Sequence, residues 1–542
     1  MAPADAWPRS HYDILHHYHA QYDRQIKAGE FEPFIYPWGT FGALIVIIYL
    51  LVPHRGRPWL QKARFLAFAW IAGFAAYSVR YTRAKNMAPA FGLGIVSAWS
   101  VIWLMAILVV NDAQIDFQRI ERMEGAFRRS SQELDTQNGT MAPASEKHDK
   151  SQRQNGVSTN GLIERKDHLG PAKRHGEFAW QPYPLTPFVE RLDWVLDIFC
   201  NFKGMGWNWR ISTLPPPPKH IQEQLYRNST NPPKHSTSTH LGQTHVYATR
   251  REVLVAAGKS VVTGYIILDV LKTIVNHDPY FWGLVHRPPP SYFPSVLTNS
   301  SVLTRMYRLT VSQLLIKTSL QCVFSLAPLA FSGLLGPSTI GARAEHWMYP
   351  EEWGSYSVVL DRGLAGWWSG WWHQTFQFAF KEPSRKIVEL LGMDKRSPQA
   401  KALQLFVAFG LSGTLHACGS YTQPGITRPL LGPLRFFLLQ ALGIFIEVSM
   451  SEVLRKTGIQ NRLPRWFMRT FTFLYVNLWF YHTAGLLVDD FAKGGIWLYE
   501  PIPFSLLRGF GFGVEGDRFW NWGGEWYRLV RGQRWWNSGI AF

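Results

Sequence analysis

The sequence has few charged residues for a soluble protein of its length. Only 17% of its 542 residues are charged, while 46% are hydrophobic and 15% are aromatic. No stretch has the cationic start, short apolar core and small-residue cleavage site of a secretory signal, so we expect no cleavable signal peptide. No internal repeat is evident, which argues weakly against a transporter built from repeated halves. The composition indicates a polytopic membrane protein.

Cysteine is also scarce, and this excludes two kinds of site. The chain has three cysteines, which are widely spaced: Cys200, Cys322 and Cys418. They predict neither a disulfide framework nor a cysteine-based metal site. Four histidines lie close together near the N-terminus: His11, His16, His17 and His19. Because Asp13 and tyrosines lie between them, this stretch is more typical of an exposed amphipathic helix than of a metal centre, and we expect no metal.

Acidic residues are too few to balance the basic ones, and the formal net charge is +18. In a soluble protein this excess would suggest a nucleic-acid partner. Here Lys and Arg cluster just outside apolar runs, as they do in the cytoplasmic loops of membrane proteins. We therefore predict contact with membrane lipids and no nucleic-acid partner.

Apolar runs near the bilayer-spanning length of about 20 residues are the main feature that is present. They predict an all-α, polytopic membrane helix bundle of about eight transmembrane helices, one of the runs being short or re-entrant. Lys259 and Asp269 fall inside one run, where we expect them near its ends or facing the protein interior. The runs are residues 34–52, 65–79, 91–110, 253–275, 318–335, 364–380, 402–419, 431–450 and 466–488.

The runs divide the chain into three parts. Residues 1–110 hold a polar segment and three transmembrane helices, and residues 251–542 hold the membrane core and an aromatic C-terminal tail. Residues 111–250 form a long polar loop, which we assign to the cytosol. Its middle, residues 128–175, has too few large apolar residues to pack a core and is predicted to be disordered. Helical spacing of apolar residues from Phe188 predicts a helix in the membrane interface.

His416 lies deep in the apolar run at residues 403–421, among small and aliphatic side chains. An ionisable group there must be paired, face a wet cavity or take part in function. Ser412 precedes it by four residues, on the same helical face, where it could orient the ring or a substrate. Spacing alone leaves a structural histidine and a functional one equally open.

A second histidine, His373, follows four tryptophans in residues 366–380, with Trp372 before it and Gln374 after it. Taken alone, this pattern favours an aromatic belt at the membrane interface. The basic stretch at residues 381–401 separates the two histidines, so one hairpin could bring both rings to one cavity. This pairing favours a shared site.

Three short blocks resemble one family. The sequence L-S-G-T-L-H at residues 411–416 is similar to the S-G-x-x-H signature of the membrane-bound O-acyltransferase superfamily, in its wax-synthase-like branch. W-W-H-Q-T-F at residues 371–376 resembles the W-H-Q segment of that branch. G-M-G-W-N-W at residues 204–209, with Leu-Pro shortly after, resembles a third block. One departure is that residues 367–371 read W-W-S-G-W where the branch commonly has F-W-G-R-R, so this chain has no arginine there to make a charge contact.

The resemblance implies an acyl-CoA-dependent O-acyltransferase of the endoplasmic reticulum. His416 would be the general base, His373 would polarise or position the thioester, and Gln374, Ser412 and Trp372 would help to bind substrate. No cofactor would be bound permanently, since acetyl-CoA or another acyl-CoA would be a co-substrate and a lipophilic alcohol the acceptor. Similarity to fungal members favours acetylation of a terpenoid or meroterpenoid hydroxyl. The alternatives are a long-chain wax-ester or sterol-ester synthase, a proton-coupled transporter, and a membrane scaffold.

Overall fold

The computed structural model describes residues 8–123, 176–228, 244–458, 462–522, 527–532 and 534–541. The predicted disorder at residues 128–175 lies outside these ranges. The described chain is mainly helical, but it is not purely so, because seven short strands form three small sheets. The first sheet pairs β1 (Glu32–Pro33) with β3 (Thr82–Arg83), the second orders β2 (Ile35–Tyr36), β7 (Gly539–Ala541) and β6 (Arg528–Val530), and the third pairs β4 (Arg119–Arg122) with β5 (Phe178–Gln181).

Five helical segments of the described chain are long and apolar enough to cross a membrane, and a sixth candidate is a bent pair. The predicted number of about eight is therefore not confirmed. The five segments are α5 with η2 (Met87–Val110), α10 (Arg250–His277), α12 with η5 (Ser301–Leu335), α16 (Pro398–Tyr421) and η9 with α17 (Leu430–Lys456). The bent pair is α18 (Arg465–Thr483) and α19 (Gly485–Gly494), which meet at 41°.

The other predicted runs form shorter or irregular elements. Residues 34–52 contain the short helix α2 (Phe41–Leu51), and residues 65–79 lie in α4 (Arg64–Tyr81). The run at residues 364–380, predicted to be short or re-entrant, is not one continuous helix: it is divided between the end of α14 (Ser357–Gly366), the π-helical turn η8 (Trp367–Trp371), a non-helical stretch and the start of α15 (Gln377–Leu390). The remaining helices are α1 (His11–Lys27), α3 (Pro58–Lys62), α6 (Ala113–Asp116), α8 (Phe188–Cys200), α9 (Lys219–Asn228), α11 (Ser295–Thr298) and α13 (Pro337–Ile340).

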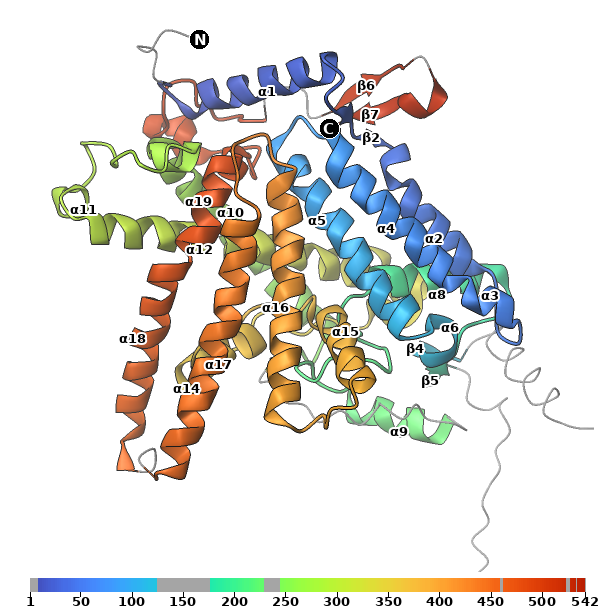
Figure 1. The fold of residues 1–542 in the computed structure, drawn as a ribbon. Coiled ribbons are helices and arrows are strands. Elements are labelled where there is room, and N and C mark those ends of the chain that lie inside the picture. Colours follow the sequence, from blue (N-terminus) through green and yellow to red (C-terminus); the bar gives the residue numbers. More distant parts are fainter. Residues whose placement is uncertain are drawn as a thin grey trace, which may run out of the picture.

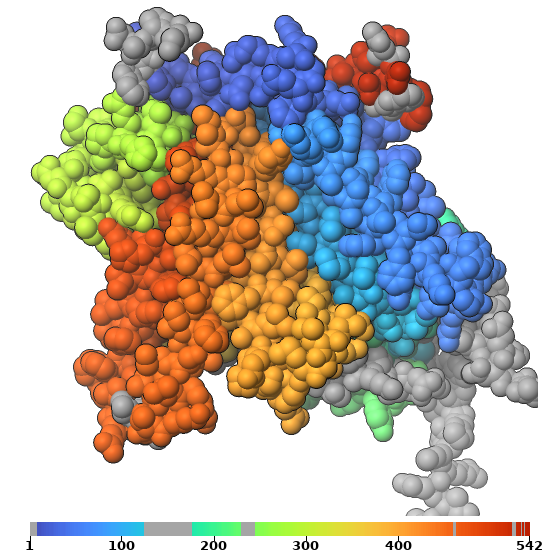
Figure 2. Space-filling view, viewed as in Figure 1, coloured from blue at the N-terminus to red at the C-terminus, as the bar shows by residue number. Residues whose placement is uncertain are grey.

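Helix α16 stands in the middle of the bundle, between α5 on one side and α17 on the other (Figure 1). Its contact with α5 is backbone on backbone, because a Cβ atom on Gly94 would lie 2.0 Å from the carbonyl oxygen of Cys418. Figure 2 shows the surface of α16 meeting that of α5 directly. Glycine therefore sets how closely α16 can lie against α5.

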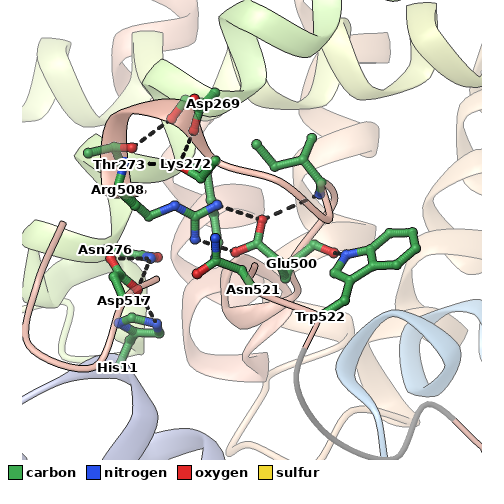
Figure 3. A network of polar contacts seen from close by, with 12 residues as sticks. His11, Asp269, Lys272, Thr273, Asn276, Glu500, Arg508, Asp517, Asn521 and Trp522 are labelled. Atoms are coloured by element: carbon green, nitrogen blue, oxygen red, sulfur yellow. Dashed lines mark hydrogen bonds and ion pairs between the residues drawn. The ribbon is translucent and has the colours of Figure 1, made fainter. Parts of the chain in front are cut away.

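Helix α1 lies across one end of the bundle, where a buried polar network ties the C-terminal segment to α10 (Figures 1 and 3). Asp269 accepts hydrogen bonds from the Ser505 hydroxyl and from the backbone N–H groups of Leu506 (2.9 Å) and Leu507 (3.2 Å). Asp269 thus faces the interior, as predicted, whereas Lys259 is exposed on α10.

The same network holds α1 in place. The Tyr12 hydroxyl donates to Asp517 at 2.9 Å, and the His11 ring lies 3.8 Å from the same carboxylate. Asn276 of α10 also donates to Asp517, at 3.4 Å. One buried carboxylate therefore connects α1, α10 and the C-terminal segment.

Candidate functional site

The segment that carries His373 is a broken helix held by its own polar side chains. After η8 the chain leaves helical geometry at Trp372 and becomes helical again at Gln377. Gln374 closes this turn, because its amide nitrogen donates to the carbonyls of Trp368 (3.0 Å) and Trp372 (2.5 Å), while Gln377 donates to its oxygen at 2.8 Å. Gln374 therefore fixes the turn on which His373 stands.

The His373 ring is surrounded by aromatic side chains. Its centroid lies 5.4 Å from the rings of both Trp372 and Phe324, 5.6 Å from that of Phe376 and 5.8 Å from that of Trp353. Nδ1 is buried and has no hydrogen-bond partner among the described residues. Such a group is costly to bury unless a ligand or water completes it, so this ring is a candidate contact for substrate.

The His416 ring is fixed by its own helix. Nδ1 lies 2.9 Å from the backbone carbonyl oxygen of Ser412, which can only accept, so Nδ1 carries the proton. In the neutral ring Nε2 then has a free lone pair, and it makes no hydrogen bond within the described chain. Ser412 orients the ring through its carbonyl rather than its hydroxyl. The ring of Phe437 packs against the imidazole, with centroids 4.5 Å apart.

All five predicted site residues line one cavity of about 1980 Å³. They are His416, Ser412, His373, Gln374 and Trp372. The cavity lies between α12, α15, α16, η8 and α18, and most of its wall is aliphatic or aromatic. The hairpin of α15 and α16, which pack together, brings the two histidines to this shared space.

Basic side chains line one end of the cavity: Lys381 and Arg385 on α15, and Lys401 on α16. Arg385 is neutralised by Glu382 at 2.7 Å and Glu389 at 3.4 Å. Neither Lys381 nor Lys401 forms an ion pair with any described residue. This end therefore has two uncompensated positive charges.

The G-M-G-W-N-W block does not line the cavity. Trp207 and Trp209 are buried in the main hydrophobic core, and Asn208 donates to the carbonyl of Asp116 at 2.8 Å. The Trp209 ring packs against Phe378 of α15, with centroids 4.4 Å apart. The block supports α15 from behind.

Two residues of the site region escaped prediction. Phe437 contacts His416 from the facing helix, and no local pattern indicates such a contact. Glu447 is the one acidic residue in the apolar stretch 436–451, and it lies partly buried against the start of the tryptophan segment. A single acidic residue in an apolar stretch is a signal in the sequence that would have identified Glu447. No group of three or more metal-binding side chains occurs among the residues that the structure describes.

Comparison with known proteins agrees with these positions. Residues 350–439, which include both histidines, match the model of the "Membrane bound O-acyl transferase family". The chain is 25% identical over 300 residues to the O-mevalon transferase yanI of Aspergillus niger, covering 52% of this chain and 58% of that protein. It is 24% identical over 330 residues to the acetyltransferase ple2 of Rhodocybe pseudopiperita (59% and 73%), and 30% identical over 168 residues to the acetyltransferase aurG of Calcarisporium arbuscula (31% and 38%).

The predicted resemblance to the membrane-bound O-acyltransferases and their fungal acetyltransferase branch is confirmed by these matches. The match spans a little over half of yanI. No solved structure gives a significant match.

Proposed function

We propose that this chain, which matches the membrane-bound O-acyltransferase family over residues 350–439, transfers an acyl group from acyl-CoA to the hydroxyl of a lipophilic alcohol. The observation that carries the proposal is the state of His416: its Nδ1–H is held by a backbone carbonyl, which leaves Nε2 as a free base beside a large cavity. An imidazole that faces a cavity and is fixed in one tautomer suits general-base catalysis.

The proton and the bonds follow from that geometry. Nε2 of His416 takes the proton of the acceptor hydroxyl as its oxygen attacks the thioester carbonyl. An ester C–O bond forms, the C–S bond breaks, and the departing thiolate receives the proton. His373 contacts the thioester and stabilises the charge that develops on its carbonyl oxygen. A largely apolar cavity suppresses hydrolysis of the thioester by limiting water.

The donor enters at the basic end of the cavity. The phosphates of CoA carry several negative charges, and Lys381 and Lys401 line the cavity without an ion pair to any described residue. Arg385 contributes less, since two glutamates already compensate it.

The acceptor is a bulky lipophilic alcohol. The volume of about 1980 Å³ exceeds the roughly 300–1,000 Å³ of ordinary ligand pockets. Relatives that are named acetyltransferases, such as ple2 and aurG, come from fungi, and this favours an acetyl donor and a terpenoid or meroterpenoid acceptor in secondary metabolism. We place the enzyme in the endoplasmic reticulum membrane. A long-chain wax-ester or sterol-ester synthase is the second candidate, which the cavity volume alone also permits.

A transporter has less support. It would need His416, Asp269 and Lys259 along one path, but neither Asp269 nor Lys259 lines the cavity. Asp269 is instead satisfied by a hydroxyl and two backbone amides.

The test uses membranes that contain the full chain. Lipophilic metabolites made with and without it are compared by mass spectrometry, where acetylation adds about 42 Da, the mass of the group transferred. His416→Ala should abolish the new ester without lowering protein abundance, whereas His482→Ala, an exposed histidine of α18 outside the cavity, should leave it. Undiminished ester with His416→Ala would refute the assignment. Solute flux without ester would favour transport.

A further inference from the structure

The tryptophan segment that leads to His373 begins at a break in α14. Gly363 has φ +57° and ψ −136°, values far from a helix, while the residues on both sides are helical. Residues 364–371 therefore start a new helical run, and its first backbone N–H groups have no acceptor within that run. In an apolar environment such unpaired donors are costly, so another part of the molecule must supply the acceptors.

Glu447 of α17 supplies both. Its Oε2 accepts a hydrogen bond from the N–H of Leu364 at 2.7 Å, and its Oε1 accepts one from the N–H of Ala365 at 3.1 Å. A carboxylate at the start of a helical run is favourable, because the run's dipole presents partial positive charge there. One side chain thus binds the tryptophan segment to α17, 82 and 83 residues away in sequence.

The approach of this carboxylate requires glycine at position 363. A Cβ atom there would lie 2.1 Å from Oε2 of Glu447, and a side chain would also be strained at this φ. Gly363 and Glu447 therefore act together: the glycine makes the break and leaves room for the acid that satisfies it.

The anchored run forms part of the cavity wall and continues to the site. Trp367 and Trp368 line the cavity, and the Trp368 ring packs on Phe437, which in turn packs on the His416 ring. The Trp368 carbonyl accepts from Gln374, the side chain that closes the turn carrying His373. The position of His373 relative to His416 thus depends on where this run begins.

We infer that Glu447 is a positioning residue for the acyltransfer site: through Leu364 and Ala365 it holds the tryptophan segment so that His373 faces His416 across the cavity. Glu447 itself does not line the cavity, so it acts through the segment and not on substrate. The inference rests on the proposed function for its catalytic consequence, whereas the anchoring itself can be measured without catalysis.

Two substitutions remove the hydrogen bonds of Glu447 to different extents. Glu447→Gln keeps one acceptor oxygen but turns an amide NH2 toward the other N–H, and Glu447→Leu removes both acceptors. Displacing a catalytic group by about 1 Å can cost about 10²-fold in rate. We therefore expect kcat to fall about tenfold in Glu447→Gln and about a hundredfold in Glu447→Leu, with the KM for acyl-CoA within about threefold because the basic end is untouched. Glu452→Gln is the matched control, since Glu452 lies on the same helix, is exposed and pairs with Arg455 and Lys456.

Hydrogen–deuterium exchange gives the second readout. In Glu447→Leu, exchange should accelerate in peptides covering residues 364–376 and remain slow in those covering α16. Values of kcat within about twofold of the parent in both variants would overturn the inference, as would acceleration spread evenly over the molecule, which would mean general destabilisation. If the parent itself forms no ester, the proposed function fails, and selective acceleration in residues 364–376 still decides whether Glu447 anchors the segment.

Discussion

Replacing Gly94 by alanine should test whether the close contact of α5 with α16 sets the position of His416. The added Cβ would lie 2.0 Å from the carbonyl oxygen of Cys418 and 2.6 Å from the backbone nitrogen of Gly419. Carbon and oxygen approach to about 3.3 Å at closest, so the helices must separate locally by more than about 1 Å. His416 lies two residues before Cys418 and would move with it.

The expected magnitude follows from that displacement. Overpacking costs about 1–3 kcal/mol, and the higher helix propensity of alanine returns at most about 1 kcal/mol. Misplacing the base by about 1 Å should lower kcat by up to about 10²-fold. Ester formation per mole of folded protein and the thermal midpoint in detergent are the measurements.

Gly73→Ala is the control for this experiment. Gly73 lies within α4, and nothing lies within 4 Å of where its Cβ would be, so alanine should leave the rate unchanged and raise stability slightly. A Gly94→Ala protein with the parent's kcat and midpoint would refute the argument that this contact positions the base.

Three further outcomes are expected. Lys381→Ala and Lys401→Ala should each raise the KM for acyl-CoA about tenfold with little change in kcat, because each removes a charge-assisted phosphate contact. Lys386 lies outside the cavity, so Lys386→Ala is the control. An unchanged KM in the Lys381 and Lys401 variants would contradict the assignment. Burial, with the nearby charges of Lys272, Arg508 and His277, lowers the pKa of His11 from 6.5 to about 2. Folding therefore keeps His11 neutral, so its contribution to stability is present above pH 6.5 and declines by about 1.4 kcal/mol per unit as the pH falls below that value. The thermal midpoints measured at pH 7 and pH 5 should therefore lie closer together in His11→Gln than in the parent, whereas His16→Gln should keep the parent's difference. The same difference in His11→Gln as in the parent would refute this. Arg308 contacts the fully buried Asp278 at 2.8 and 2.9 Å, so Arg308→Met leaves that carboxylate without its ion-pair partner. This should lower the free energy of unfolding by about 3–5 kcal/mol. The double variant with Asp278→Asn should recover part of that loss. An unchanged midpoint in denaturation would count against it.

Apolar length alone predicted four of the long helical segments. The runs at residues 91–110, 253–275, 402–419 and 431–450 each fall within a long helical segment. In these runs the apolar length is enough to specify a long helical segment, so local sequence is sufficient. The run at residues 364–380 has similar composition, but Gly363 just before it permits a break that a carboxylate from another helix stabilises. Length and hydropathy contain no information about that partner.

The sequence predicted which residues form the site better than it predicted which atoms they contact. A histidine inside an apolar run is visible in the sequence, and the basic hairpin explained how two such residues could meet. Which atom of Ser412 contacts His416 depends on the helix backbone, and the contact with Phe437 depends on how α17 packs. The two-residue strands were not predictable either, since their pairing joins distant parts of the chain, such as Ile35 with Ala541.

Helix α16 carries Lys401 near one end and His416 about four turns further on, both on the cavity wall. At 1.5 Å per residue these positions are about 22 Å apart along a continuous helix. The rigid helix therefore separates the position where the phosphates of the donor would bind from the position where the ester bond would form. That interval is comparable to the extended phosphopantetheine arm of CoA, so a donor without such an arm could occupy one position but not both at once. Activated acetyl esters of small alcohols should consequently be poor replacements even at concentrations that saturate the cavity.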